Sequence, residues 1–513
     1  MQKLTSNFWI GPVLSGILTF GAVCQINFLV SWICFVPLFV AIPNSTSKKV
    51  FQKGLLFGFV FSALAFFWMI PGAERFTGNS ILYGLLVFLL SAVFISVFYG
   101  SLLFLFSKVS QKEIFTNSLL LQALLMASVV CIGEALLTIV SKNLPWFDIH
   151  TGNGLTANLF AIQPASLFSI HVLTFVIVVV NFLTAQMILK QSYAKLYIPV
   201  SIVVAYIMIG WVLLQLSDNI KKEIKSFKVA ILAENIPPDL KWDEYNGNML
   251  AQRLLDLNKG AVALKPDLIL WSESAIPWTY KKNDDLVNAV LSITNHANVT
   301  HIMGINTAVR ENEVYNSAYC ILPGGEVTSR YDKQYLLSFI EKPLGGLIMP
   351  FFSSRGFIAK TNKENAVPLN TPFGKAGMLI CNEAAVAAAA SAMVKNGAQF
   401  LFNISNDGWF SDTYIVRLHY YYARLRAVES RKDIAINCNN GYSGLIKATG
   451  VIEEQRRDEE PFVQMVTMEP NNEMSLASAY PNLFVYACTL FVIIIGAFNY
   501  FNSRKKTTTT QSS

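Results

Sequence analysis

Hydrophobic residues follow two different patterns along this chain. Residues 9–217 form nearly continuous apolar runs, residues 228–470 alternate short apolar runs with polar stretches, and residues 483–501 are apolar again. A helix that crosses a bilayer needs ~20 apolar residues. The pattern therefore predicts membrane spans near residues 9–24, 26–42, 54–72, 80–107, 117–140, 166–189, 195–217 and 483–501. Because the first two are short and tightly joined, a re-entrant hairpin is an alternative for them.

The polar region between the apolar segments has the pattern of an α/β domain. Strands are predicted at 228–235, 266–273, 301–307, 314–322, 376–381, 399–405, 434–440, 443–449 and 461–468. Helices are predicted at 247–259, 284–297, 384–396 and 414–430. Such alternation indicates sheets covered by helices. We expect a transmembrane domain over 1–217 with about seven spans, a globular domain over 228–470, a C-terminal transmembrane helix over 483–501 and a cytoplasmic tail over 502–513.

Composition and charge set the orientation of these segments. Only 14% of the 513 residues are charged and the mean hydropathy is +0.43, whereas soluble domains have ~25% charged residues. Cytoplasmic loops are enriched in Lys and Arg. One side of the expected topology holds Lys3, Lys48, Lys49, Lys53, Lys108, Lys112, Lys190, Lys195, Arg504, Lys505 and Lys506. The short loops on the other side hold Arg75 and Lys142. The pattern predicts cytoplasmic termini and a globular domain outside the cytoplasm, and it makes the net charge of +7 a topology signal rather than a sign of nucleic-acid binding.

The seven cysteines divide between the two regions. Cys24, Cys34, Cys131 and Cys488 lie in apolar segments, where cysteine behaves as a small hydrophobic residue. Cys320, Cys381 and Cys438 lie in the globular domain. The sequence has no CxxC pair and no Cys/His metal spacing, so we expect no metal and no other cofactor. Three cysteines cannot all pair, and a free thiol in an oxidising compartment suggests a use.

Three residues of the domain have the chemistry of a thiol acyl-transfer site. Cys381 closes one apolar strand, Glu273 closes another, and Lys333 lies between them in the chain. A thiol with a pKa of ~8.5 needs a base to form the nucleophilic thiolate. Glu273, in an apolar setting, suits that base. Lys333 suits the stabilisation of a thiolate or an oxyanion, and the backbone N–H after Cys381 is a second oxyanion donor.

Each of these residues also has an ordinary structural interpretation. A cysteine at a strand end is commonly a buried small hydrophobic residue, a glutamate can cap a helix or form an ion pair, and a lysine beside Asp332 is commonly solvated. A Cys–His pair that uses His301 or His419 is a further alternative. Sequence spacing alone leaves these interpretations open.

The motifs around these residues resemble a known family. They are Glu234–Pro237, Lys241–Trp242, Trp271–Pro277, Tyr331–Lys333, Ile380–Glu383, Asn403–Phe410, Ala423–Glu429 and Asn439–Gly441 in the domain, with Gly58, Trp68, Pro145–Trp146 and Ile162–Ser166 in the apolar part. The chain resembles the apolipoprotein N-acyltransferases, the integral-membrane branch of the nitrilase superfamily. The resemblance implies an αββα sandwich next to a multi-span helical domain.

The resemblance also implies roles for individual residues. Glu273 is the expected general base, Lys333 the electrostatic residue and Cys381 the acylated nucleophile, while Glu341 orients Lys333 or the attacking amine. Supporting positions that shape the pocket are Trp242, Glu383 and Trp409. The sequence departs from the family pattern at Asn382, where a tyrosine is usual, at Ser338–Glu341 and in the alanine-rich run Ala384–Ala390.

The implied reaction is acyl transfer in two half-reactions. A membrane phospholipid is the expected acyl donor and a diacylated apolipoprotein the acceptor, in the bacterial cytoplasmic (inner) membrane with the domain on the periplasmic side. We expect a monomer with no nucleic acid partner. Two alternatives remain, a membrane-anchored nitrilase-type hydrolase and a catalytically inactive lipoprotein-binding membrane protein.

Two further features of the sequence suggest function. Glu134 lies inside the apolar segment 117–140, where an ionisable group is costly and often functional. The alternative is a carboxyl near the outer end of the span, neutral or paired with Lys142. Segment 343–370 begins with an apolar stretch broken by Gly and Pro. It predicts either a packed loop or a mobile lid that contacts the bilayer.

Overall fold

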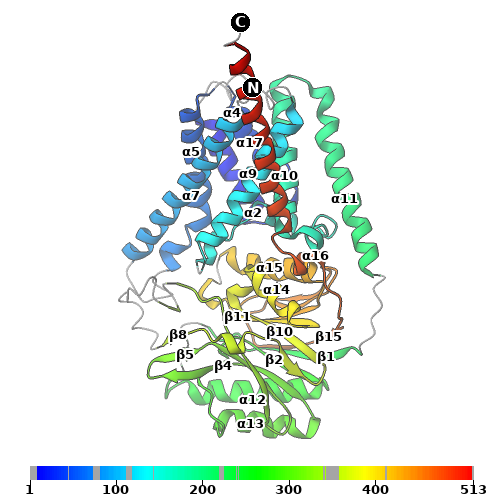
Figure 1. Cartoon of the computed structure of the whole chain (residues 1–513). Coiled ribbons are helices and arrows are strands. Elements are labelled where there is room, and N and C mark those ends of the chain that lie inside the picture. Colours follow the sequence, from blue (N-terminus) through cyan, green and yellow to red (C-terminus); the bar gives the residue numbers. More distant parts are fainter. Residues whose placement is uncertain are drawn as a thin grey trace.

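The computed structural model contains a helical bundle stacked end-on against a two-sheet domain (Figure 1). It describes residues 9–43, 45–72, 81–110, 118–142, 144–218, 225–237, 240, 242–338, 341–342, 357–410 and 413–510. The part of the predicted lid over 343–356 therefore lies outside the described residues.

The bundle contains long and short apolar helices. Among the described residues, five helices are long and apolar enough to cross a membrane. They are α5 (Ser47–Phe66), α7 (Ile81–Ser110), α9 (Leu119–Val140), α10 (Ala165–Leu189) and α11 (Tyr197–Asp218), the last extended at its start by η3 (Tyr193–Leu196). The other three expected spans correspond to shorter apolar helices in the described residues, Ile10–Val23, Phe28–Ala41 and Leu483–Phe498.

Local sequence explains the short helices at the start of the chain. Helix α2 (Ile10–Val23) has 14 residues, and Ile26 then adopts a positive φ of 52° that ends the helical path. The next segment divides into α3 (Phe28–Ser31), capped by the Asn27 side chain, and α4 (Val36–Ala41), which has a proline in its first turn. A cap and a proline each favour a helix start, so they place two short helices where one was expected.

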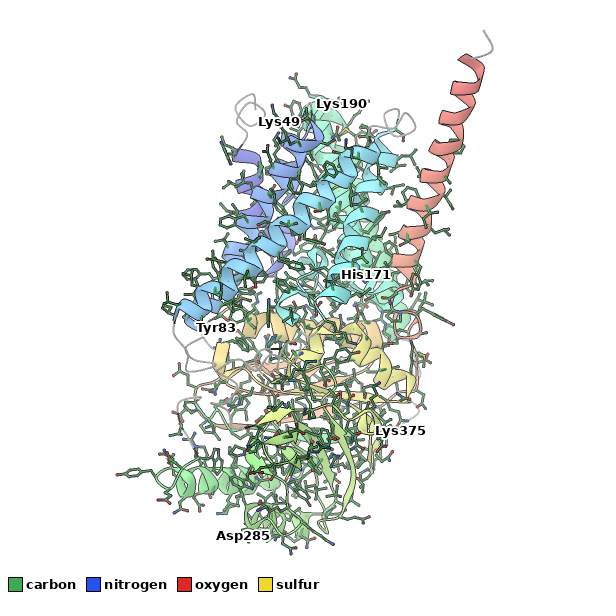
Figure 2. The ribbon with its side chains drawn as sticks, turned by 60° about the vertical axis from the view of Figure 1, so that its left-hand side comes forward. Lys49, Tyr83, His171, Lys190, Asp285 and Lys375 are labelled. Carbon is green, nitrogen blue, oxygen red and sulfur yellow. The ribbon has the colours of Figure 1, made fainter. Side chains whose placement is uncertain are left out.

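The last helix, α17 (Leu483–Thr510), runs from the sheet domain along the bundle (Figure 1). Its apolar part covers Leu483–Phe498. Lys49 and Lys190 lie at the end of the bundle far from the sheets, whereas Tyr83 lies at the near end (Figure 2). The connections after α4 and after α10 are therefore on the side opposite the globular domain.

The globular domain has two sheets. The nine-stranded sheet contains β1 (Phe227–Ala233), β2 (Leu268–Trp271), β3 (Ile276–Thr279), β4 (Thr300–Arg310), β5 (Glu313–Tyr315), β6 (Ser317–Ile321), β7 (Val327–Asp332), β8 (Ile358–Ala359) and β15 (Phe462–Met468). The six-stranded sheet contains β9 (Leu369–Thr371), β10 (Gly374–Ile380), β11 (Phe400–Asn406), β12 (Ile434–Asn439), β13 (Ser443–Ile446) and β14 (Ile452–Arg456). Strands β1, β2 and β4 are parallel neighbours in the first, and β10, β11 and β12 in the second.

Helices cover the outer face of each sheet (Figure 1). Helices α12 (Gly247–Ala263) and α13 (Asp285–Thr294) cover the nine-stranded sheet, and α14 (Ala387–Lys395) and α15 (Ile415–Ser430) lie between the six-stranded sheet and the bundle. Buried side chains of both sheets, such as Val229 and Leu270 on one and Met378 and Leu401 on the other, form a common core. Fully burying a side chain of this size contributes about 1.5–3 kcal/mol. The arrangement confirms the predicted αββα sandwich.

Helix α15 fastens the sandwich to the bundle with polar side chains. The Tyr414 hydroxyl donates to the carbonyl oxygen of Ala65 at 2.7 Å, and the Tyr422 hydroxyl donates to that of Asp148 at 2.9 Å. Buried Arg424 donates to the carbonyl oxygen of Thr156 at 2.8 Å. Buried polar groups need such partners. These bonds fix the face of the domain that carries α15 against the bundle.

Candidate active site

The three residues singled out from the sequence meet in space, each just after a strand. Glu273 follows β2, Lys333 follows β7 and Cys381 follows β10. The Lys333 Nζ lies 3.7 Å from Glu273 Oε1, and the charges of Glu273 and Lys333 both act on the Cys381 thiol. Glu341 joins the group, because its Oε1 lies 3.0 Å from Lys333 Nζ.

Close approach of the backbone places the Glu273 carboxyl. Gly304 of β4 lies against the backbone of residues 272–274, and a Cβ at that glycine would be 2.2 Å from the carbonyl oxygen of Ser272. The Asn316 side-chain amide donates to Glu273 Oε1 at 2.8 Å, and the Asn406 N–H donates to Oε2 at 3.0 Å. Burial raises the pKa of Glu273, and the charge of Lys333 opposes that rise. A raised pKa suits a general base, which must both take and return a proton.

Lys333 is a fully buried cation. Its side chain is 1% exposed. Its backbone N–H donates to the carbonyl oxygen of Asn316. Burial acts to lower the pKa of Lys333, but the charges of Glu341, Cys381 and Glu273 outweigh it and raise the pKa above the ordinary lysine value. The ammonium is therefore a fixed positive charge beside the thiol. Because a buried charge is stable only when it is paired, Glu341 at 3.0 Å and Glu273 at 3.7 Å stabilise it there.

Cys381 has an unusual backbone conformation. Its φ is +57°, in the left-handed region that residues with a side chain adopt rarely. It lies where β10 ends and the short helix η7 (Cys381–Ala385) begins, and its side chain is partly exposed. Burial of the sulfur and the charge of Glu273 raise the pKa of the Cys381 thiol, while Lys333 opposes the rise. A raised pKa disfavours the thiolate, so a nucleophilic role needs a base beside the thiol.

Glu383 holds the segments of Lys333 and Cys381 together. Its Oε1 accepts the N–H groups of Gln334 at 2.7 Å and Tyr335 at 3.1 Å, and its Oε2 accepts that of Ile380 at 2.8 Å. The Tyr331 hydroxyl donates to both oxygens at 2.9 Å. The carboxyl therefore lies between the residues that precede Cys381 and those that flank Lys333, and it has a positioning role rather than a place on the pocket wall.

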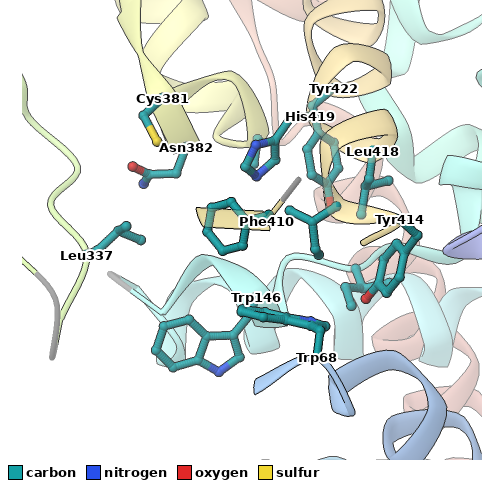
Figure 3. A pocket seen from close by; sticks show the side chains of 13 residues that line it. Trp68, Trp146, Leu337, Cys381, Asn382, Phe410, Tyr414, Leu418, His419 and Tyr422 are labelled. Carbon is teal, nitrogen blue, oxygen red and sulfur yellow. The ribbon is translucent and has the colours of Figure 1, made fainter. Parts of the chain in front are cut away.

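A pocket joins the thiol to the bundle (Figure 3). The lining of the pocket is mostly apolar and aromatic. The bundle contributes Trp68, Trp146 and Ile149, and the sandwich contributes Leu337, Cys381, Asn382, Ala385, Phe410, Tyr414, Ile415, Leu418, His419 and Tyr422. Asn382, which replaces the usual tyrosine, donates to the carbonyl oxygen of Tyr335 at 3.0 Å.

Comparison with known proteins gives the family. The carbon-nitrogen hydrolase model matches residues 228–468, and the model of the apolipoprotein N-acyltransferase N-terminal domain matches residues 15–183. The chain belongs to the apolipoprotein N-acyltransferase family. It is similar to the apolipoprotein N-acyltransferase of Geobacter metallireducens, with 24% identity over 91% of this chain and 90% of that protein. The one from Thermotoga maritima is 27% identical over 86% of this chain and 83% of that protein.

Two solved structures are similar to about half of this chain. A carbon-nitrogen hydrolase from Helicobacter pylori G27 has 14% identity and a TM-score of 0.37, over 48% of this chain and 89% of that one. A superfamily member from Saccharomyces cerevisiae has 15% identity and a TM-score of 0.38, over 50% of this chain and 94% of that one.

The described pocket lining does not include two of the supporting residues of the apolipoprotein N-acyltransferase pattern, Trp242 and Trp409. Trp242 packs edge-to-face on Trp278 with ring centroids 5.3 Å apart, beside the core under α12 and α13. It is absent from the described lining of the Cys381 pocket, so the expectation that it shapes this pocket is not met there. Trp409 lies in η8 (Gly408–Phe410), and its side chain is outside what the structure describes.

One group at the pocket was missed in the sequence. His419 of α15 donates from Nδ1 to Asp407 Oδ1 at 3.0 Å, and the Asp407 side chain is 2% exposed. The sequence suggested His419 only as a direct partner of Cys381 in a Cys–His pair. The signal for the pair is an aspartate that directly follows strand β11 and a histidine on the helix after it.

Glu134 is paired, but with a different residue from the one suggested by sequence. Its Oε1 accepts from the N–H of Thr151 at 2.9 Å and from its hydroxyl at 2.6 Å, and its Oε2 accepts from the Thr174 hydroxyl at 2.8 Å. His150 Nδ1 lies 3.3 Å from Oε2. The described partners thus come from the segment after α9 and from α10, and the suggested pairing with Lys142 is not seen among them.

Proposed function

We propose that this protein transfers an acyl chain from a membrane phospholipid to the N-terminal α-amine of a diacylglyceryl-cysteine lipoprotein, through a thioester on Cys381. The observation that carries the proposal is the position of the thiol. It lies beside a buried carboxyl–ammonium pair and opens into an apolar pocket whose wall is completed by Trp68 and Trp146 of the bundle.

In the first half-reaction, the Glu273 carboxylate takes the thiol proton while Cys381 Sγ attacks an ester carbonyl of the phospholipid. The C–S bond forms, and the negative charge that develops on the carbonyl oxygen is stabilised by Lys333 and by the N–H that follows Cys381. The C–O bond of the ester then breaks. Glu273 gives its proton to the leaving alkoxide, which departs as a lysophospholipid.

In the second half-reaction, the α-amine of the lipoprotein attacks the thioester carbonyl. The C–N bond forms, the C–S bond breaks, and Glu273 carries a proton from the nitrogen to the departing sulfur. Glu341 keeps the Lys333 ammonium in place during both steps, since their atoms are 3.0 Å apart. Glu383 holds the strand end before Cys381 against the loop that carries Lys333.

The position of the pocket fits substrates that are delivered by a bilayer. We infer that the chain lies in the bacterial inner membrane with the sandwich on the periplasmic side. Lys49 and Lys190 lie at the far end of the bundle (Figure 2), and basic loops favour the cytoplasm. The pocket is at the opposite end, where lipid and the lipoprotein N-terminus are both accessible.

A hydrolase would use the same residues but pass the acyl group to water, so the products decide between the two functions. The purified protein is incubated with phospholipid in detergent micelles, with and without a synthetic diacylated lipopeptide. We expect N-acyl lipopeptide and lysophospholipid in equal amounts. Free fatty acid as the main product, at the same rate with or without the lipopeptide, would refute acyl transfer.

A further inference from the structure

The proposed reaction leaves one proton without an acceptor. An α-amine has a pKa of ~8, so it arrives at neutral pH mostly as an ammonium ion. To form the amide it must lose one proton before attack and another afterwards. The second proton goes through Glu273 to the Cys381 sulfur, which leaves as a thiol. The first proton leaves the site, and Glu273 cannot carry both.

The carboxylates around the thiol are already occupied. Glu341 accepts from Lys333 Nζ with Oε1 and from the Leu337 N–H with Oε2. Asp407 Oδ1 accepts from the Ser405 hydroxyl at 3.0 Å and from His419 at 3.0 Å. A carboxylate that already accepts from a cation or from two donors is a poor acceptor for a further proton.

His419 has the free nitrogen that this step requires. An Asp carboxylate can only accept, so Nδ1 of the neutral imidazole carries the hydrogen and Nε2 carries a lone pair. Within the described residues, Nε2 makes no hydrogen bond. The side chain is 20% exposed and lines the same pocket as Cys381 (Figure 3). An imidazolium formed there would be balanced by Asp407.

The surroundings of His419 contain few competing charges. On its own helix, the nearby titrating group is Tyr422, with ring centroids 6.5 Å apart, and Phe410 of η8 packs edge-on at 5.8 Å. Cys381 faces it from η7, and Asp407 follows β11, with Cys438 of β12 behind it. On the bundle side, Trp68, Trp146 and Ile149 carry no titrating group, and Asp148 lies beyond Tyr422, whose hydroxyl donates to its carbonyl oxygen.

We propose that His419, oriented by Asp407, accepts the proton that the acceptor ammonium loses before it attacks the thioester. This inference rests on the acyl-transfer function proposed above and assigns a residue to its second half-reaction. The proton moves from the nitrogen to Nε2 and then to solvent, while the pair of electrons left on nitrogen forms the C–N bond. The first half-reaction releases an alkoxide that takes the proton already on Glu273, so it has no need of His419.

The test separates the two half-reactions in His419→Gln. The acyl-enzyme is formed with phospholipid, isolated, and mixed with diacylated lipopeptide between about pH 6.5 and about pH 9.5, a range that brackets the amine pKa of ~8. We expect the variant to transfer its acyl group about ten- to a hundredfold more slowly than the wild type at about pH 6.5, because only a few per cent of an amine with a pKa of ~8 is neutral there. Its rate should then rise with pH until the amine is neutral, and it should approach the wild-type rate at about pH 9.5.

A second acceptor distinguishes proton transfer from a damaged pocket. Hydroxylamine is already neutral at neutral pH, so it should discharge the thioester of both proteins at similar rates. Arg417→Gln, on the exposed face of the same helix and outside the described pocket lining, is the control variant and should show no pH-dependent defect. Equal slowing of thioester formation and transfer, or a transfer defect that is the same at all pH values and with hydroxylamine, would assign His419 a structural role. A wild type that forms no thioester would instead refute the proposed function.

Discussion

Replacement of Glu383 by Gln should slow the enzyme although this side chain does not line the described pocket. Glu383 is fully buried and all of its partners are donors: three N–H groups and the Tyr331 hydroxyl. Glutamine has one oxygen in place of two. If that oxygen keeps the N–H groups of Gln334 and Tyr335, the new NH₂ group faces the Ile380 N–H, donor against donor.

The cost follows from these bonds. An unpaired buried N–H costs about 1–3 kcal/mol, and each remaining bond loses about 1 kcal/mol when its acceptor is no longer charged. We therefore expect a loss of about 3 kcal/mol in the interaction that joins the Lys333 loop to the strand end before Cys381. If half of this loss raises the activation free energy of thioester formation, the step slows about tenfold, because ~1.4 kcal/mol corresponds to a factor of ten.

The assay measures thioester formation in a single turnover, together with the thermal midpoint in detergent. Glu453→Gln is the matched control, because Glu453 is half exposed and its Oε2 lies 4.0 Å from Lys447 Nζ, and such surface pairs contribute ~0–1 kcal/mol. Glu383→Gln should lower both the rate and the midpoint, and the control neither. A Glu383→Gln protein within threefold of the wild-type rate, with an unchanged midpoint, would refute the positioning role.

Three further predictions concern the groups beside the thiol. Lys333→Ala should slow thioester formation on the order of 10²–10³-fold, since it removes the charge beside the oxyanion; near-normal rates in a stopped-flow measurement would exclude that role. The rate of thioester formation should fall as pH decreases through the pKa of Glu273, which burial raises above 4.5, because only the carboxylate can take the thiol proton; a pH–rate profile that is flat down to that value would contradict a base at this position. In Glu341→Gln this acid limb should shift to lower pH, because the Glu341 charge raises the pKa of Glu273; a shift to higher pH would show that the coupling has the opposite sign.

The sequence was most informative where an apolar strand ends in a polar residue. The runs that end before Glu273 and Cys381 are β2 and β10, and both are buried along most of their length. Because β2 and β10 belong to different sheets, the proximity of the two residues depends on how the sheets face each other and not on the strand pattern. Lys333 was harder to place, because β7 is exposed at its start and buried only at Tyr331 and Asp332. Its polar pattern does not indicate a strand, and its assignment depended on the family motif.

Other features depend on contacts that no local pattern contains. Glu383 and Gln334 are distant in the chain, and their bond exists only because two sheets face each other. Asp407 and His419 are only 12 residues apart, but their bond depends on where α15 lies relative to the end of β11. In the bundle, hydropathy predicted apolar segments correctly but not helix length, because the cap at Asn27 and the positive φ at Ile26 interrupt the helical path.

The most direct test of the account is the mass of the protein after incubation with phospholipid. We predict that intact-mass spectrometry shows the addition of one acyl chain, that peptide mapping locates it on Cys381, and that diacylated lipopeptide removes it with the formation of N-acyl product. The Cys381→Ala protein should gain no mass. An unmodified wild type during turnover, or an acyl adduct that persists in Cys381→Ala, would contradict a thioester at this residue.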